Sequence, residues 1–185
     1  MRFAPVSVAA LSLFALAVPA AAATAEIAIG QKVPARFSAR DVTGKARNWA
    51  SIAGRKGTVF VLFRSARWCP YCQAQLKSLK DLQAQVEARG YKLAALSYDS
   101  PAALAAFQAK SGIGYTLLSD EKSSMIDAFG LRDPAYAEGS YAYGVPRAST
   151  LIVDAKGVVR WKTVATDYKI RADNAAILRA VDSLR

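Results

Sequence analysis

The chain has 185 residues, 53% of them hydrophobic, and a formal net charge of +11 at pH 7. This length and composition suit a single domain with its own hydrophobic core. The sequence holds no histidine and two cysteines. That inventory excludes a Cys-His catalytic pair and leaves a zinc site, which needs about four ligands, without enough of them. The basic residues are scattered, so specific nucleic-acid binding is not expected.

The N-terminal residues have the pattern of a secretory signal peptide. Arg2 precedes an apolar run over residues 6–18, and alanine-rich cleavage sites follow Pro19. An uncleaved membrane anchor is the alternative, but the apolar run is shorter than the ~20 residues of a spanning helix. We therefore predict a signal peptide over residues 1–25, one domain over residues 26–185, a periplasmic or secreted location, and no stable membrane insertion after cleavage.

Strand and helix patterns alternate along the first half of the mature chain. Residues 37–49 predict a β-hairpin that turns at Thr43-Gly44, and residues 51–57 predict a short helical turn. A buried strand over residues 58–63 leads through the cysteines into an amphipathic helix over about 70–88, which Gly90 ends. A second buried strand over residues 91–98 follows. Asp99-Ser100-Pro101 then predicts the cap of a helix that runs to about Lys110.

The second half predicts smaller elements around a long loop. A short strand or extended link over residues 115–118 precedes a helix over about 123–129, which we expect Asp120 to cap. Residues 131–146 predict an irregular loop that flanks the functional site, and its Tyr136, Tyr141 and Tyr143 form either a substrate-facing wall or ordinary packing. A hairpin over 150–154 and 158–164 and a helix over about 173–184 close the chain. This order predicts an α/β fold, a mixed sheet with helices on both faces.

Cys69 and Cys72 form a Cys-x-x-Cys motif at the predicted start of a helix. The free N–H groups and the dipole of a helix start stabilise a thiolate at Cys69, and Pro70 suits the first helical position. Arg64 and Arg67 add positive charge, and such surroundings lower a cysteine pKa from about 8.5 to roughly 3.5–7.5. Cys72 can then attack a mixed disulfide at Cys69 and release it as an intramolecular disulfide. A structural disulfide and two inert thiols are the alternatives, but so short a loop constrains the unfolded chain little.

Several blocks of sequence carry a resemblance to a known family. The segment Phe63-Arg64-x-x-x-Trp68-Cys69-Pro70-Tyr71-Cys72, the later blocks at 95–100, 117–120 and 129–131, and the hairpin residues 151–160 occur in the same order in that family. The chain resembles the peroxiredoxin-like branch of the thioredoxin-like superfamily, the alkyl hydroperoxide reductase/thiol-specific antioxidant (AhpC/TSA, redoxin) family. The resemblance implies a thioredoxin-like mixed sheet flanked by helices, with an N-terminal β-hairpin extension.

The resemblance also implies supporting residues around the cysteines. Trp68 would shield the disulfide and shape a docking surface. Arg147 stands near the place of an arginine that lies beside the thiolate in such proteins. Pro146 stands near the place of a cis-proline that faces the cysteines, with an ordinary trans turn as the alternative.

We therefore expect an exported thiol–disulfide oxidoreductase with antioxidant activity, in which Cys69 is the nucleophile and Cys72 the resolving thiol. Its substrate would be a protein disulfide or a hydroperoxide, and its reductant a thiol protein or a low-molecular-weight thiol, with no cofactor and no metal. Typical members have Thr or Ser three residues before the peroxide-reacting cysteine, where this chain has Ala66, so the sequence leaves the substrate open. The alternative is a non-enzymatic thioredoxin-fold binding module with a structural disulfide.

Overall fold

The structure is a computed structural model that describes Met1 and residues 25–184. The predicted signal peptide thus lies almost entirely outside the described residues. Within the described part of the chain, no helix combines the length and the apolar character needed to cross a membrane.

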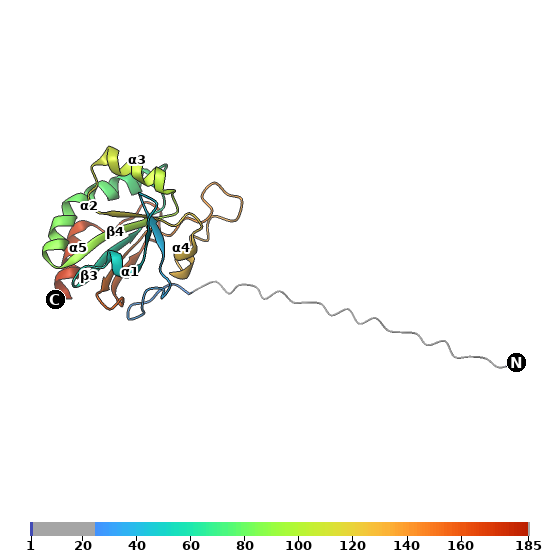
Figure 1. Cartoon of the computed structure of the whole chain (residues 1–185), viewed down its shortest axis with the longest axis horizontal. Helices are drawn as coiled ribbons and strands as arrows, with labels where there is room; N and C mark the ends of the chain where they lie inside the picture. Colours follow the sequence, from blue (N-terminus) through green and yellow to red (C-terminus); the bar gives the residue numbers. More distant parts are fainter. Residues whose placement is uncertain (2–24, 185) are drawn as a thin grey trace.

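Residues 25–184 contain one mixed sheet of seven strands, in the order β2-β1-β5-β4-β3-β6-β7 (Figure 1). The strands are β1 (Ala39–Asp41), β2 (Ala46–Arg47), β3 (Gly57–Leu62), β4 (Tyr91–Ser97), β5 (Thr116–Ser119), β6 (Ser149–Asp154) and β7 (Val159–Val164). Strand β3 is parallel to β4 and antiparallel to β6, and all of its residues are buried. A strand that is covered on both faces reads as a continuous apolar run, which is how β3 was recognisable in the sequence.

Helices cover both faces of the sheet, as the sequence predicted (Figure 1). They are α1 (Trp49–Ile52), α2 (Pro70–Ala88), α3 (Pro101–Ser111), α4 (Ser124–Ala128) and α5 (Asn174–Ser183). Helices α2, α3 and α5 pack on the face that carries Val59 and Val61 of β3, whereas α1 and α4 pack on the face that carries Phe60 and Leu62. The period-2 alternation of a strand therefore divides the hydrophobic core into two layers.

The predicted hairpin near the N-terminus is confirmed. Strands β1 and β2 pair antiparallel around a turn in which the Asp41 carboxylate accepts hydrogen bonds from the Thr43 N–H and hydroxyl. Strand β1 also pairs with β5, which adds the hairpin to the edge of the sheet. An aspartate before a turn glycine commonly makes such local bonds, so short-range chemistry specifies this extension.

Strand directions bring four separate segments to one edge of the sheet. The carboxyl ends of the parallel strands β3 and β4 lie at the same edge. Leu62, the last residue of β3, pairs with Ser149, the first residue of β6, and Ser149 pairs with Val164, the last residue of β7. The loop that follows β3, the residues that precede β6 and the residues that follow β7 consequently meet there, and the cysteines lie among them.

Candidate active site

The cysteine pair occupies the first turn of α2. Cys69 is the N-cap residue, Pro70 is the first helical residue, and the Cys72 N–H donates to the Cys69 Sγ at 3.2 Å. The two sulfurs form a disulfide bond across Cα atoms 5.2 Å apart. Cys69 is 2% exposed and Cys72 is fully buried. The structure therefore places both cysteines at the start of a helix, where the free N–H groups and the helix dipole favour a thiolate, with Cys69 at the N-cap.

A buried aspartate holds the cysteine loop, residues 63–69, in shape. The Asp99 carboxylate, just after β4, accepts hydrogen bonds from the Ser65 hydroxyl at 2.7 Å, the Ala66 N–H at 2.6 Å and the Ser97 hydroxyl at 3.0 Å. Asp99 was expected to cap α3, and the structure corrects this, because the neighbouring Ser100 makes the capping bond. Bonds to a buried carboxylate are charge-assisted, so Asp99 ties the loop firmly to the end of β4.

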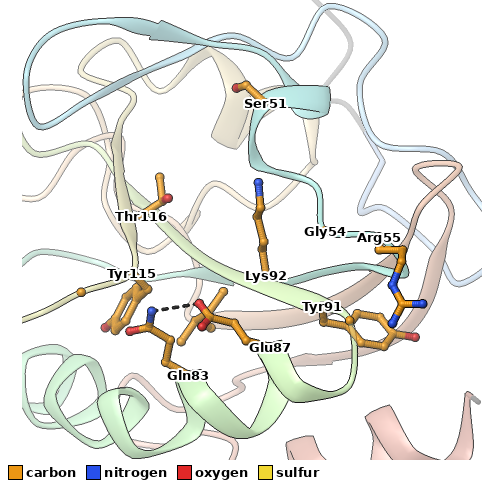
Figure 2. A pocket seen from close by; sticks show the side chains of 12 residues that line it. Ser51, Gly54, Arg55, Gln83, Glu87, Tyr91, Lys92, Tyr115 and Thr116 are labelled. Carbon is orange, nitrogen blue, oxygen red and sulfur yellow. Dashed lines mark hydrogen bonds between the residues drawn. The ribbon is translucent and has the colours of Figure 1, made fainter.

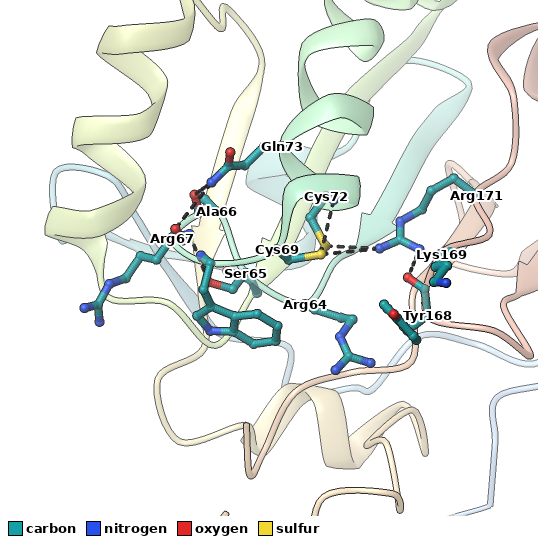
Figure 3. The surroundings of a disulfide bond; sticks show 12 residues. Arg64, Ser65, Ala66, Arg67, Cys69, Cys72, Gln73, Tyr168, Lys169 and Arg171 are labelled. Carbon is teal, nitrogen blue, oxygen red and sulfur yellow. Dashed lines mark hydrogen bonds between the residues drawn. A yellow bond between two sulfur atoms is a disulfide. The ribbon is translucent and has the colours of Figure 1, made fainter. Parts of the chain in front are cut away.

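The sulfurs have a cationic neighbour that the sequence reasoning missed. Arg171 lies in the arginine loop, residues 165–173 between β7 and α5, and its guanidinium donates to the Cys72 Sγ at 3.1 Å and to the Cys69 Sγ at 3.7 Å (Figure 3). The carbonyls of Tyr168 and Ile170 accept from the same guanidinium and fix its direction. Burial and nearby Arg64 lower the pKa of Arg171 to about 10, so it remains a cation at neutral pH. A cation in contact with a sulfur favours the thiolate.

Arg147 has a different partner from the one expected. Its guanidinium donates to the Glu26 carboxylate at 2.6 Å and to the Gly130 carbonyl at 3.3 Å. Lys162 of β7 donates to the same carboxylate, and the hydrogen bonds from Lys162 and Arg147 lower the pKa of Glu26. Arg147 thus joins the N-terminal segment to the sheet, and the guanidinium at the sulfurs is that of Arg171. The structure thus corrects the expectation, taken from the family resemblance, that Arg147 lies beside the thiolate.

The peptide bond before Pro146 is trans, which was the alternative to the cis-proline that the resemblance implied. The described residues contain no cis peptide bond. Pro146 is buried and pairs with Arg132 in an isolated antiparallel bridge. Its position before β6 still places it at the edge of the sheet where the cysteines lie.

A buried arginine organises the aromatic residues around the cysteines. Arg64 is 3% exposed, and its guanidinium donates to the Asp133 carboxylate at 3.0 Å. The guanidinium carbon lies 4.7 Å from the ring centre of Tyr136 and 5.6 Å from that of Tyr168. Cation–π attraction and the ion pair together connect the loop over residues 131–146 to the cysteine loop.

These rings form an aromatic collar at the disulfide, which we define as Trp68, Tyr71, Tyr136, Tyr141 and Tyr168. Trp68 donates its indole N–H to the Tyr98 hydroxyl and meets Tyr141 edge-on. Tyr141 meets Tyr136 edge-on, and Tyr71 meets Tyr168 edge-on. Tyr143 stands apart, because its ring lies over Arg132, so only two of the three tyrosines suggested for a wall belong to the collar.

Two pockets differ in their relation to the cysteines. A cavity of about 180 Å³ adjoins Arg171 and has a mixed lining, with the polar side chains of Gln75, Thr150 and Thr163 beside several alanines, a valine and an isoleucine. The Gln75 Oε1 and the Arg171 Nε are buried and have no hydrogen-bond partner among residues 25–184. A larger pocket of about 500 Å³, which includes Lys92 and the hydrogen-bonded Gln83 and Glu87, lies at the amino ends of the parallel strands (Figure 2). Of the two, only the cavity at Arg171 is lined by a residue that contacts the sulfurs.

Comparison with known proteins gives concordant matches. The model of the AhpC/TSA family matches residues 29–162. A putative peroxiredoxin from Mycobacterium tuberculosis strain H37Rv is 31% identical over 149 residues, covering 80% of this chain and 90% of the relative. Peroxiredoxin Bcp from Escherichia coli K12 is 29% identical over 143 residues, covering 77% and 88%.

Solved structures show the same fold. Peroxidoxin BcpB from Mycobacterium tuberculosis superposes with a TM-score of 0.69 at 21% identity, covering 85% of this chain and 97% of that one. Reduced Prx3 from Vibrio vulnificus, solved in complex with hydrogen peroxide, gives a TM-score of 0.71 at 24% identity, covering 84% and 99%.

Proposed function

Because the chain belongs to the AhpC/TSA family and is a thiol-dependent oxidoreductase of the peroxiredoxin type, we propose that it is an exported enzyme that reduces hydroperoxides through Cys69 and Cys72. Its curated relatives are named peroxiredoxins, which supports a hydroperoxide as the oxidant. Family membership also favours an enzyme over a binding module with a structural disulfide.

The proposed cycle uses both sulfurs. The Cys69 thiolate attacks one hydroperoxide oxygen, so that an S–O bond forms, the O–O bond breaks and the alcohol or water leaves with a proton. Cys69 is then a sulfenic acid. The Cys72 thiolate attacks the Cys69 sulfur and releases water once the departing hydroxide is protonated, which leaves the disulfide. A dithiol reductant returns both cysteines to thiols and takes the oxidising equivalents away as its own disulfide.

The observation that carries this proposal is the convergence of Arg171 and the start of α2 on one sulfur pair. Both features favour the anionic form of sulfur, which is the nucleophile. Ala66 offers no hydroxyl to a bound peroxide, and its N–H is engaged by Asp99. In this proposal Arg171 supplies the donor that orients the peroxide and stabilises the leaving oxygen.

Rapid mixing of the reduced protein with hydrogen peroxide tests the proposal, with Trp68 fluorescence as the reporter. We expect oxidation at least tenfold faster than that of a free thiol. Cys69→Ser removes this reaction, whereas Cys72→Ser retains the first step and leaves a sulfenic acid that a dimedone-type reagent traps. Oxidation at the rate of a free thiol contradicts peroxidase function.

A second candidate, reduction of protein disulfides, is favoured by the exposed rings beside the sulfurs. The same instrument distinguishes the two candidates, with a small disulfide-bonded protein as the oxidant in place of peroxide. Faster oxidation by the protein disulfide than by an equal concentration of hydrogen peroxide supports this candidate. A Cys69–Cys72 bond that resists excess dithiol supports the binding module instead.

Export is the third part of the proposal, and it rests on the sequence of residues 1–25. Mass spectrometry of the protein from a cell that expresses the full chain tests it. We expect a mature N-terminus at Thr24 or Glu26, in the periplasmic or extracellular fraction. An intact N-terminus on a cytoplasmic protein contradicts export.

A further inference from the structure

The cavity at Arg171 lies beside the disulfide, and neither cysteine lines it. Its wall comes from Gln75 of α2, the first residues of β6, the last residues of β7 and the arginine loop. Gln75 lies one helical turn beyond Cys72 on the buried face of α2. The volume of about 180 Å³ is far above the roughly 10–15 Å³ that one water needs, so the cavity admits a small organic molecule.

Two side chains of this wall have buried polar atoms to which the described part of the chain supplies no partner. Gln75 is 7% exposed, and its Oε1 accepts no hydrogen bond there. The Arg171 Nε is also buried and donates none. A buried polar group without a partner destabilises a fold, which is why such groups are rare. One acceptor and one donor are thus available to a molecule in the cavity.

Arg171 also lacks a carboxylate partner. It forms no ion pair within the described part of the chain, although Asp167 and Asp173 belong to the same loop. Those two carboxylates accept the N–H groups of Lys169 and Ala176 instead. Of the three guanidinium nitrogens, one donates to backbone carbonyls of the loop and one to the sulfurs (Figure 3). An anion that reaches the third nitrogen would compensate this partly buried charge.

We infer that this cavity binds a short hydroxycarboxylate, a class of ligand that lactate represents. Its carboxylate accepts from the Arg171 Nε, its hydroxyl donates to the Gln75 Oε1, and its aliphatic part contacts the apolar side chains of the wall, which include Val164 and Ile170. Among the described residues, Arg171 is the only cation that lines the cavity, which suits a monoanion better than phosphate or sulfate. The site goes beyond the proposed function, because ligand binding here requires no particular oxidant.

Binding at this site is linked to the redox state of the cysteines. Because the Arg171 guanidinium contacts both sulfurs, a Cys69 thiolate and a bound carboxylate share one positive charge, and each is stabilised less when the other is present. The ligand therefore binds the disulfide form more tightly than the thiolate form. By linkage, the bound ligand raises the pKa of the Cys69 thiol, and a thiol that is less ionised reacts more slowly.

Three matched ligands test the site on the oxidised protein. Lactate, its neutral amide lactamide, and propionate, which lacks the hydroxyl, are titrated at constant ionic strength, and calorimetry or ligand-observed NMR gives each Kd. We expect a millimolar Kd for lactate, and binding about tenfold weaker for lactamide, which lacks the charge. Propionate should bind about fivefold more weakly than lactate, because one hydrogen bond is lost. Lactate should bind the reduced protein about fivefold more weakly than the oxidised protein at alkaline pH.

Matched variants locate the ligand. Gln75→Met removes the unpartnered acceptor, so it should weaken lactate binding about fivefold, leave propionate binding unchanged and keep or raise the unfolding midpoint. Gln83→Met is the control, because Gln83 lies further along α2 outside the cavity, and it leaves the affinity for lactate unchanged. Ala165→Val narrows the cavity and retains both polar groups, and it should also weaken lactate binding. This variant keeps the site testable should Gln75→Met fail to fold.

The pH dependence of iodoacetamide alkylation tests the link to the sulfurs. Saturating lactate should raise the pKa of the Cys69 thiol and slow alkylation at neutral pH, whereas lactamide should do neither. Lactate that binds without changing this pKa contradicts the link.

Three results overturn the site itself: equal binding of lactate and lactamide, no binding of lactate up to about 50 mM, or wild-type affinity in both Gln75→Met and Ala165→Val. The last result would place the anion elsewhere on this basic protein. Because none of these measurements uses peroxide, oxidation by hydrogen peroxide at the rate of a free thiol would contradict the peroxidase proposal and leave the site intact.

Discussion

Two aromatic clusters in this protein use similar ring geometry in opposite surroundings. The closed cluster, on the face of the sheet covered by α1 and α4, consists of Phe37, Trp49, Phe60 and Phe129. Phe37, Phe60 and Phe129 are almost fully buried, and the cation–π contacts of the described residues involve none of these four rings. The aromatic collar is instead built of Tyr and Trp around a buried arginine and opens to solvent at the disulfide.

This difference separates ring contacts that stabilise the fold from ring contacts that leave an exposed surface beside the disulfide. Rings in the closed cluster join the residue before the first hairpin, α1 and the residue after α4 to the sheet, and nearly all of the area of the three phenylalanine rings leaves water, with Trp49 partly buried beside them. Rings in the collar remain partly hydrated, so their burial contributes much less to the stability of the chain alone. Their remaining area becomes useful only when another molecule covers it.

The largest expected effect comes from breaking the closed cluster. Phe60→Ala should lower the free energy of unfolding by about 3–5 kcal/mol, because it removes a fully buried ring and leaves a cavity. Tyr136→Ala, in the collar, is the matched change and should cost about 1 kcal/mol. Guanidinium unfolding curves of both variants check the comparison, and equal losses would contradict the division into a closed and an open cluster.

The next effect comes from removing the cation that centres the collar. Arg64→Met should lower the free energy of unfolding by about 1–3 kcal/mol, because it leaves the Asp133 carboxylate, whose side chain is 14% exposed, without its charged partner. The control is Arg132→Met, whose ion pair with Asp127 is more exposed and should contribute up to about 1 kcal/mol. Chemical unfolding measures both, and a larger loss for Arg132→Met would refute the central role of Arg64.

Replacing Arg171 should change the free energy of unfolding less than these substitutions do, but it should change the reactivity of the cysteines more. Arg171→Met should raise the pKa of the Cys69 thiol, since it removes a cation within hydrogen-bond distance of the sulfurs. At neutral pH the rate of alkylation then falls about tenfold. Arg171→Lys should recover part of the rate, because lysine keeps the charge but lacks the planar guanidinium. The pH dependence of iodoacetamide alkylation measures the shift, and an unchanged pKa counts against Arg171.

The smallest expected effect concerns the loss of stability at acidic pH, which we expect to arise at a residue outside both aromatic clusters. Burial opposes ionisation of Asp41 in the first hairpin, but hydrogen bonds from Thr43 and Arg47 lower its pKa from 3.8 to about 2. Because the pKa of the folded state is the lower one, this stabilisation is present above pH 3.8 and is lost as the pH falls toward 2. Asp41→Asn removes the titrating carboxyl group, so the free energy of unfolding should depend less on pH in this range. Unfolding midpoints at several pH values test it, and identical pH profiles for the two proteins contradict it.

Local patterns in the sequence were enough to predict most of the fold. The apolar run of β3, the helix over Pro70–Ala88 and the turn at Gly44 each depend on neighbours close in the chain, and the structure confirms them. Asp120 also makes the capping bonds expected at α4, to the N–H groups of Met125 and Ile126. Helix periodicity, caps and turns are short-range effects, which is why one sequence reveals them.

The missed parts of the site depend on partners far away in the sequence. Arg171 lies about a hundred residues beyond the cysteines in an irregular loop, where a single arginine carries no periodic signal. Asp99 stood beside another good capping residue, and the pattern could not show that Ser100 would make that bond. Arg147 was placed by spacing alone, while its actual partner, Glu26, lies 121 residues away.

The distance in sequence between the sulfurs and Arg171 has a consequence for the chain during its synthesis. Polypeptides emerge N-terminus first, and the cysteines precede Arg171 by 102 and 99 residues. Until the segment after β7 is made and folds back, the newborn thiols lack their cationic neighbour and react more as ordinary cysteines do. The pair thus gains this electrostatic support only after the segment that carries Arg171 has been made and has folded back onto the start of α2.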